Sequence, residues 1–400
     1  MICTIFLLTG CSPSVQEPGQ EPPSFSERSQ VTESPEIDFS RVDELMENMT
    51  LEEKVGQLLI VGMEGKTYGD QLDHLIRLYH VGGIILLGKN VSYPAGIVKL
   101  LNESKKANSS YKIPLFVSVD EEGGRVSRLP SSMKKLPTAE YLGRTGDERL
   151  VYETGVYLAE LLHAFGYNMN YAPVLDVHSN PKNPVIGDRS FSSNPEEVAN
   201  LSMAMMKGMT DNGIISVVKH FPGHGDTHVD SHLSLPVIEK TLEELYRTEL
   251  IPFQRAIDEH ADMIMVAHIM FPKLDDEYPS SLSKKIITGL LRKELHYEGV
   301  VITDDLTMGA IVNEFTVPEA AVQSFIAGSD LLLIAGDYEA QVDTFNALMN
   351  AVQAGTISEN RIDESVRRIL ELKERYQLKD DPVEEIDLDA IENKFNELMG

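Results

Sequence analysis

The sequence predicts an α/β protein built as a single (β/α)₈ barrel, the TIM-barrel fold. Eight short apolar runs alternate with helical patterns along the body of the chain, which favours parallel strands joined by helices. The runs are apolar throughout, as expected of parallel strands buried on both faces. Polar residues recur where the runs end, and in a barrel the carboxyl ends of the strands form one functional face. These residues are Asp120, Asp176, Lys219, His220, His268 and Asp304.

The eight predicted strands and the best-marked helices follow in order. The strands are expected at residues 58–62, 82–88, 114–120, 169–177, 214–218, 263–268, 300–304 and 331–335. Capping boxes at Thr50 and Thr241 each begin a helix. Glycines end two others, so we expect helices at 148–165 and 195–212. Three more are expected at residues 337–354, 358–376 and 387–399.

Composition and charge exclude several classes of function. The formal net charge is −28, which argues against nucleic acid or an anionic membrane surface as a partner. The two cysteines are Cys3 and Cys11, so the body of the chain has no cysteine nucleophile, disulfide or cysteine-ligated zinc site. The acidic surface is interpreted as an aid to solubility.

The N-terminus predicts a lipid anchor and a tether. A short apolar run leads into Leu8-Thr9-Gly10-Cys11, which looks like a bacterial lipobox, although basic residues do not precede it. We therefore expect a lipoprotein signal at 1–11 with Cys11 lipidated, a disordered Pro/Glu/Ser tether at 12–36, and the barrel domain at 37–400. The protein would then be extracytoplasmic and touch the membrane through this anchor. A disordered cytosolic tail is the alternative.

The stretch Lys219–Pro236 carries four of the eleven histidines. They are His220, His224, His228 and His232, spaced four apart as zinc ligands on one helical face would be. A metal-dependent hydrolase is therefore one hypothesis. Pro222, Gly223 and Gly225 argue against a continuous helix here, which makes it the second hypothesis.

The first hypothesis pairs Asp230 with His232. A carboxylate two residues from an imidazole can fix its tautomer and raise its pKa, which makes a better proton donor. Asp304 ends the seventh strand, where a carboxylate is a candidate nucleophile, whereas Asp305 fits a helix N-cap better. A nucleophilic aspartate facing a proton donor is the arrangement of a retaining glycosidase.

Four segments carry a resemblance to a known family. They are Asp120–Val126 (DEEGGRV), Asn183–Phe191 (NPVIGDRSF), Lys219–His232 (KHFPGHGDTHVDSH) and Thr303–Leu306 (TDDL). In this order they resemble the family 3 glycoside hydrolases, specifically the β-N-acetylglucosaminidase branch, over roughly residues 40–376. The D-x-H loop distinguishes this branch from the β-glucosidases of the family.

The resemblance implies the role of each residue. Asp304 would be the nucleophile, His232 the general acid/base and Asp230 its dyad partner. Asp120, Arg189, Lys219 and His220 would hold a terminal N-acetylglucosamine. Arg128 and His268 either line the pocket or serve packing, and His224 and Asp226 are expected to shape the loop.

The implied activity is a retaining exo-β-N-acetylglucosaminidase acting on cell-wall muropeptide saccharides. It would need no metal, no cofactor and no obligate protein partner. Two alternatives stay open: a phosphorylase, because a histidine acid/base repels phosphate less than a carboxylate would, and a lipoprotein that binds sugars without turnover. The combination of a nucleophile with a proton donor argues against pure binding.

Overall fold

The computed structural model describes residues 39–228, 230–231 and 233–400. The predicted lipidation site Cys11 and the predicted tether 12–36 lie outside the described residues, as does His232. The strands are β1 Leu59–Val61, β2 Gly83–Leu86, β3 Phe116–Val119, β4 Met169–Asn170, β5 Ile215–Phe221, β6 Met263–Val266, β7 Val300–Thr303 and β8 Leu332–Ile334.

These strands form the predicted parallel barrel. They lie in the order β7-β6-β5-β4-β3-β2-β1-β8, and each pair is parallel. β7 and β8 complete the circle, because Ile302 pairs with Leu331 and the Thr303 N–H donates to the Leu331 carbonyl at 3.2 Å. The (β/α)₈ fold expected from the sequence is therefore confirmed.

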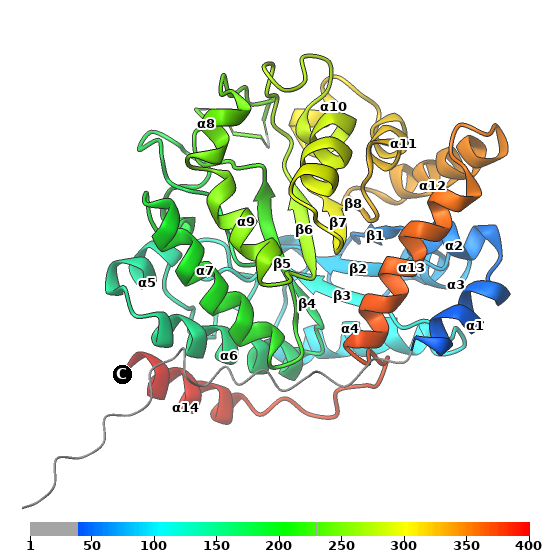
Figure 1. Ribbon diagram of the computed structural model, residues 1–400. Helices are drawn as coiled ribbons and strands as arrows, with labels where there is room; N and C mark the ends of the chain where they lie inside the picture. The colour runs from blue at the N-terminus through cyan, green and yellow to red at the C-terminus, as the bar shows by residue number, and fades with distance from the viewer. Residues whose placement is uncertain (1–38, 229, 232) are drawn as a thin grey trace, which may run out of the picture. The chain divides into compact units, whose positions relative to one another are not determined.

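Helices surround the strands (Figure 1). The α-helices are α1 Ser40–Asn48, α2 Leu51–Gln57, α3 Asp70–Arg77, α4 Pro94–Asn108, α5 Ala139–Thr145, α6 Glu148–Phe165, α7 Pro195–Thr210, α8 Leu242–Tyr246, α9 Leu250–Asp258, α10 Gly309–Val312, α11 Val317–Ala327, α12 Tyr338–Gln353, α13 Glu359–Arg375 and α14 Leu388–Met399. Shorter or irregular helices are η2 Gly88–Asn90, η3 Gly187–Arg189, η4 Ser280–Leu282 and the π-helix η5 Lys285–Glu294.

The helix signals read from the sequence act as expected. The side chains of Thr50 and Thr241 accept from the backbone N–H three residues later, and both capping boxes are complete. Gly166 ends α6 with φ of 97°, a left-handed conformation that glycine adopts without steric cost. Asn194 caps α7 by accepting from the Glu196 N–H at 3.0 Å. These local contacts fix where each helix enters and leaves the barrel.

Two strand predictions need correction. The predicted strand 169–177 is too long, because β4 has two residues and the chain then makes one isolated pairing, Val174 with Lys219. Pro173 has no N–H to donate, which interrupts a regular ladder at this point. β5 is longer than predicted and runs through Phe221, so Lys219 lies inside the strand rather than on the loop after it.

The amino ends of the first strands are tied together by one buried lysine from α13. Lys373 Nζ donates to Gln57 Oε1 at 2.8 Å, to the Gly82 carbonyl at 2.9 Å and to the Pro114 carbonyl at 2.7 Å. Three acceptors match the three N–H bonds of an ammonium group. The last long helix of the barrel is thereby bonded to residues that precede β1, β2 and β3.

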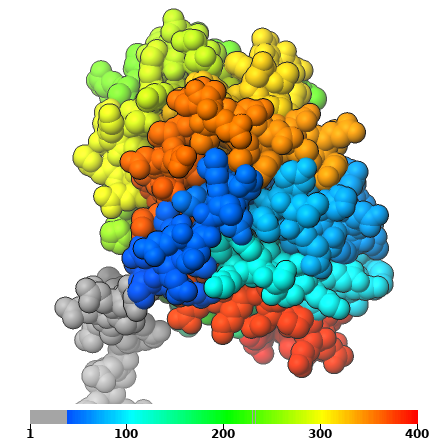
Figure 2. All heavy atoms as spheres, turned by 90° about the vertical axis from the view of Figure 1, so that its right-hand side faces the viewer, coloured from blue at the N-terminus to red at the C-terminus, as the bar shows by residue number. Residues whose placement is uncertain are grey.

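The residues after α13, 376–400, form a C-terminal segment, and part of it lies along α4. The Asn102 side chain donates to the Val383 carbonyl at 2.8 Å and accepts from its N–H at 2.9 Å, and Asn108 donates to Asp380 Oδ2 at 2.6 Å. Figure 2 shows this red segment beneath α4, and the blue helices α1 and α2 against the orange α12 and α13. Within the described residues, no helix is long and apolar enough to cross a membrane.

Candidate active site

Charged side chains gather where β3, β5 and β7 end. Asp120 and Glu122 follow β3, Lys219 and His220 are among the last three residues of β5, and Asp304 follows β7. The ends of β5 and β7 lie at the same level, because Phe221 and Thr303 both pair with Val266 of β6. The carboxyl ends of the strands therefore form the polar face predicted from the sequence.

Glu122 is the centre of a buried ion cluster. Lys219 Nζ lies 2.7 Å from Asp120 Oδ1 and 2.7 Å from Glu122 Oε1. Arg189 binds the same carboxylate in bidentate fashion, with Nε 2.8 Å from Oε2 and Nη2 2.8 Å from Oε1. The cluster thus joins three of the four predicted sugar-binding residues, Asp120, Arg189 and Lys219. Glu122 had no predicted role, although it belongs to the quoted DEEGGRV segment.

The ion cluster stays charged although it is buried. Burial alone would raise the pKa of Glu122, but Arg189 and Lys219 outweigh it and hold this pKa well below its usual range. Burial would lower the pKa of Lys219, yet Asp120 and Glu122 raise it overall. The pKa of Arg189 is likewise raised by Glu122 against the effect of burial. Two cations facing two carboxylates give a rigid set of donors and acceptors suited to the hydroxyl and amide groups of a sugar.

His220 is oriented by Asp176, a second residue without a predicted role. Its Nδ1 lies 2.7 Å from Asp176 Oδ2, so the imidazole donates its Nδ1 proton to that carboxylate. The contact depends on the chain after β4, where the Leu175 N–H donates to the Lys219 carbonyl at 2.6 Å. His220 Nε2 lies 3.4 Å from Arg189 Nη2, which joins the fourth predicted sugar-binding residue to the ion cluster.

The loop that leads to Arg189 is hydrogen-bonded to the segment after β5 through Asn183. The Asn183 side chain accepts from the Val185 and Ile186 N–H groups at 2.8 and 3.0 Å. Its Nδ2 donates to the His224 and Gly225 carbonyls at 2.8 and 2.9 Å. One asparagine therefore fixes the approach to η3, in which Arg189 lies, against the histidine-rich stretch.

Asp304, the predicted nucleophile, is partly exposed at the end of β7. Its Oδ1 accepts from the Asp305 N–H at 2.8 Å. Burial acts to raise the pKa of Asp304, but His268, His220, the Asp305 N–H and Lys219 together lower it below its usual value. Asp304 is therefore ionised at neutral pH, which a nucleophilic carboxylate requires.

His268 and Asp305 are fixed by hydrogen bonds beside Asp304. His268 is fully buried, and its Nε2 donates to the Asp305 carbonyl at 2.9 Å, so Nδ1 accepts from the Ser281 hydroxyl at 2.6 Å. Asp305 accepts from the Thr307 and Ala335 N–H groups, each at 3.0 Å. The expectation that Asp305 caps a helix is wrong: α10 has Met308 at its N-cap, and Asp305 instead holds the turn after β7. His268 performs a packing and hydrogen-bonding role.

The three described histidines of Lys219–Pro236 do not share a helical face, because His220 lies in β5 and His224 and His228 lie on the loop after it. His220 contacts Asp176, His224 contacts Thr227 and Ser231, and His228 contacts Asn180. Among the described residues, no group of three or more His, Cys, Asp or Glu side chains is arranged to hold a metal ion. Asp226 pairs with Lys240 at 2.9 Å, in keeping with the expected loop-shaping role.

The predicted acid/base pair is described in part. The Asp230 carbonyl accepts from the Leu233 and Ser234 N–H groups at 2.9 and 3.1 Å. His232 itself lies outside the described residues. The assignment of the proton donor therefore continues to rest on the sequence.

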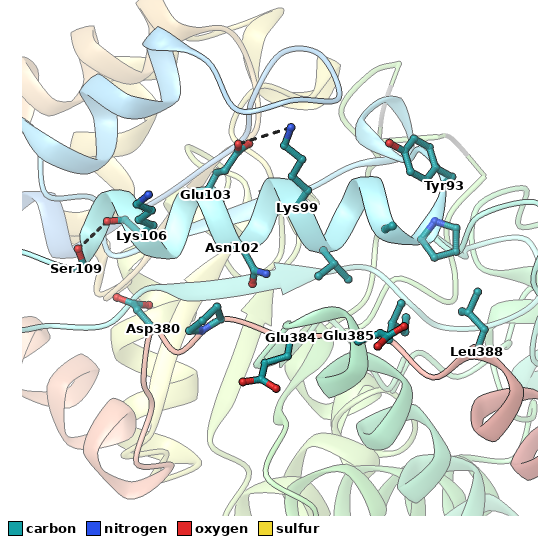
Figure 3. A pocket seen from close by; sticks show the side chains of 15 residues that line it. Tyr93, Lys99, Asn102, Glu103, Lys106, Ser109, Asp380, Glu384, Glu385 and Leu388 are labelled. Carbon is teal, nitrogen blue, oxygen red and sulfur yellow. Dashed lines mark hydrogen bonds and ion pairs between the residues drawn. The ribbon is translucent and has the colours of Figure 1, made fainter.

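A groove of about 890 Å³ lies away from this face, between α4 and the C-terminal segment (Figure 3). Its lining is mainly apolar, with carboxylates and two lysines along its edges. The ion pair Lys99–Glu103 on its α4 side spans 4.0 Å. None of the described site residues lines this groove, so the strand ends hold the candidate active site.

The parallel barrel places the predicted nucleophile, Asp304, at the same end as a buried cluster of fixed donors and acceptors. Residues 50–372 match the glycosyl hydrolase family 3 N-terminal domain. The chain belongs to this family.

Relatives refine the class. A β-hexosaminidase A of Pseudoalteromonas piscicida is 38% identical over 77% of this chain, and the match spans 55% of that relative. A β-hexosaminidase of Nitrosomonas eutropha is 33% identical over 76% of this chain and 87% of its own length. A solved family 3 β-N-acetylglucosaminidase from Paenibacillus sp. str. FPU-7 is 42% identical, with a TM-score of 0.82 over 88% of this chain and 68% of that one. The expected class, a glycoside hydrolase of the β-N-acetylhexosaminidase type, is confirmed.

Proposed function

We propose that the chain is a retaining exo-β-N-acetylglucosaminidase that releases terminal N-acetylglucosamine from cell-wall saccharides. The observation that carries the proposal is the environment of Asp304. The residue is partly exposed, its Oδ1 accepts from the Asp305 N–H, its pKa is lowered, and it lies within electrostatic range of Lys219 and His220. A nucleophile beside a charged sugar-binding cluster favours a covalent mechanism at a single terminal sugar.

Two steps follow from this arrangement. In the first, a carboxylate oxygen of Asp304 bonds to the anomeric carbon while the bond to the leaving oxygen breaks, and the His232 imidazolium supplies the proton to that oxygen. In the second, water attacks the same carbon, the His232 imidazole takes its proton, and the bond to Asp304 breaks. Asp230 orients the imidazole and stabilises its charged form.

The sugar-binding cluster would act before and during the first step. Asp120 would accept from sugar hydroxyls, Lys219 and Arg189 would donate to the sugar, and His220 Nε2 would accept, because the ring proton is on Nδ1. Because these groups are paired with one another in advance, little reorganisation is needed when the sugar binds. Such a pre-organised cluster would suit the binding of one terminal sugar residue.

The test of the nucleophile is Asp304→Ala, with Asp305→Asn as its neighbour control. We expect Asp304→Ala to abolish turnover of p-nitrophenyl N-acetylglucosaminide while circular dichroism stays unchanged. A 5-fluoro-N-acetylglucosaminyl fluoride should label the wild type at Asp304, located by peptide mass spectrometry. Wild-type turnover by Asp304→Ala would contradict the mechanism, and an inert wild type would favour a sugar-binding lipoprotein.

Two further assays define the substrate and the acceptor. Comparing the N-acetylglucosaminide with the corresponding glucoside, with and without EDTA, tests both the sugar and the metal hypothesis. Adding phosphate and measuring sugar 1-phosphate separates hydrolysis from phosphorolysis. Release of N-acetylglucosamine from muropeptide fragments tests the proposed cell-wall substrate.

We also propose that Cys11 carries a lipid that holds the enzyme outside the cytoplasmic membrane. The support is the LTGC sequence followed by a proline-rich segment. Radiolabelled palmitate should enter the full-length protein in a bacterial host and should not enter Cys11→Ser. Equal labelling of both would contradict the anchor.

A further inference from the structure

Ser231, the middle residue of the Asp230-Ser231-His232 segment, points into the protein. It is buried, with 2% of its surface exposed. Its hydroxyl lies 3.1 Å from His224 Nε2, and its carbonyl accepts from the Ala310 N–H at 3.0 Å. Ser231 is therefore fixed both to the start of its own loop and to α10, which follows the nucleophile.

His224 connects Ser231 to the proposed sugar-binding cluster. Its backbone N–H donates to Asp176 Oδ1 at 2.6 Å, while the other oxygen of Asp176 binds His220. The rings of His224 and His220 also meet edge to face, with their centroids 5.8 Å apart. One buried histidine thus contacts both the group that orients His220 and the loop that carries the proposed proton donor.

The hydrogen bonds of His224 have a defined direction. The Thr227 hydroxyl donates to the His224 carbonyl at 3.3 Å, so its oxygen is left to accept from His224 Nδ1 at 3.1 Å. Nε2 is then the acceptor, and the Ser231 hydroxyl must donate to it. Burial lowers the pKa of His224 to about 4, which keeps this tautomer neutral over the working range of most enzymes.

We propose that His224, acting through the Ser231 hydroxyl, is a positioning residue that holds Ser231, the chain neighbour of both proposed dyad residues, next to the Asp176–His220 pair. The inference rests on the proposed function, since it concerns the placement of the proposed proton donor. A general acid contributes about 10²–10⁴-fold to a rate when its proton is correctly placed. A displacement of about 1 Å costs on the order of 10²-fold. The hydrogen bond between His224 and Ser231 therefore controls the rate, although neither of these two residues takes part in the reaction.

The variants Ser231→Ala, His224→Asn and His224→Gln separate positioning from packing. Glutamine reaches far enough for its carbonyl oxygen to replace Nε2 and accept from Ser231, whereas asparagine reaches only the Nδ1 position. The matched control is His296→Asn, because His296 is exposed, lies outside the site and has φ of 58°, which asparagine tolerates.

Two substrates distinguish the effects. The disaccharide of N-acetylglucosamine has a poor leaving group that must be protonated. The leaving group of 2,4-dinitrophenyl N-acetylglucosaminide departs without a proton. We expect Ser231→Ala and His224→Asn to lower kcat/KM on the disaccharide about 10²-fold. On the dinitrophenyl substrate, kcat/KM of these two variants should stay within about threefold of the wild-type value. Azide should raise their kcat, because it replaces the water molecule that needs a general base. His224→Gln should retain most of the wild-type selectivity between the substrates.

Several results would overturn the positioning role. They are equal losses on both substrates, no loss with Ser231→Ala, or a glutamine variant as impaired as the asparagine variant. Ser231→Ala removes one hydroxyl, so it provides the test even where a His224 variant fails to fold. A wild type inert on both substrates would overturn the proposed function itself. An active wild type with uniform losses would overturn the positioning role alone.

Discussion

Replacing Glu122 by glutamine should damage both folding and catalysis. The change leaves Arg189 without its bidentate carboxylate and leaves Lys219 with Asp120 as its remaining partner. Removing one partner from a buried ion pair costs about 3–5 kcal/mol, because the other charge stays desolvated. An unfolding entropy of roughly 2.1 cal/mol/K per residue, over about 360 residues, gives about 0.75 kcal/mol/K. The Tm of Glu122→Gln should therefore fall by about 4–7 °C.

The catalytic effect follows from the orientation of Arg189. A hydrogen bond to a charged group contributes about 1.5–3 kcal/mol, so losing the one that Arg189 would make to the sugar lowers kcat/KM about 10- to 100-fold. Calorimetry and steady-state kinetics on p-nitrophenyl N-acetylglucosaminide measure the two effects. The matched control is Glu140→Gln, which breaks the exposed pair with Arg144 on α5 and should move Tm by less than about 1 °C.

The reasoning about Glu122 would be refuted by a Tm within about 1 °C of the wild type. Such a result would mean that water or a neighbouring group neutralises Arg189 and Lys219 without the carboxylate. A lowered Tm with unchanged kcat/KM would instead show that the ion cluster stabilises the barrel without contributing to sugar binding.

Two further predictions concern buried charges. Burial raises the pKa of Glu121 to about 7, so the folded state binds more protons than the unfolded state between about pH 4.5 and 7 and loses stability as the pH rises through that window. Glu121→Gln should therefore be more stable than the wild type at pH 8, by up to about 3 kcal/mol, but not at pH 4; equal urea midpoints at both pH values would contradict this. Lys373→Met should cost about 2–4 kcal/mol by leaving three acceptors without a donor, whereas the exposed control Lys379→Met should leave the urea midpoint unchanged.

The alternation of apolar runs with helix signals was sufficient to predict the barrel. A parallel strand buried on both faces has a distinctive composition, and capping residues such as Thr50 and Gly166 act locally. The length of β4 could not be predicted in the same way. Pro173 follows an apolar run, and whether a strand continues past a proline depends on which neighbour needs its N–H.

The site shows the same division between local and distant signals. Asp120, Arg189, Lys219 and His220 were predicted, and they lie in contact as one charged cluster. Glu122 was not predicted. The predicted set held two cations, Arg189 and Lys219, and one carboxylate, so the need for a second carboxylate was a signal that could have been used. Asp176 was noted at a strand end, but its pairing with His220 requires the chain after β4 to lie along β5.

The bonds that Lys373 makes with the strand ends set an order of assembly. The residues it joins are separated along the chain by 316, 291 and 259 positions, and β1 also requires β8 as a neighbour. Contacts this distant in sequence form late, because a long loop must close before they can stabilise anything. A nascent chain that stops short of β8 leaves β1 with an unpaired edge that can join another chain. A chain that has been made only as far as β7 is therefore expected to aggregate more readily than the complete barrel, in which β8 covers β1 and α13 bonds to the residues before β1, β2 and β3.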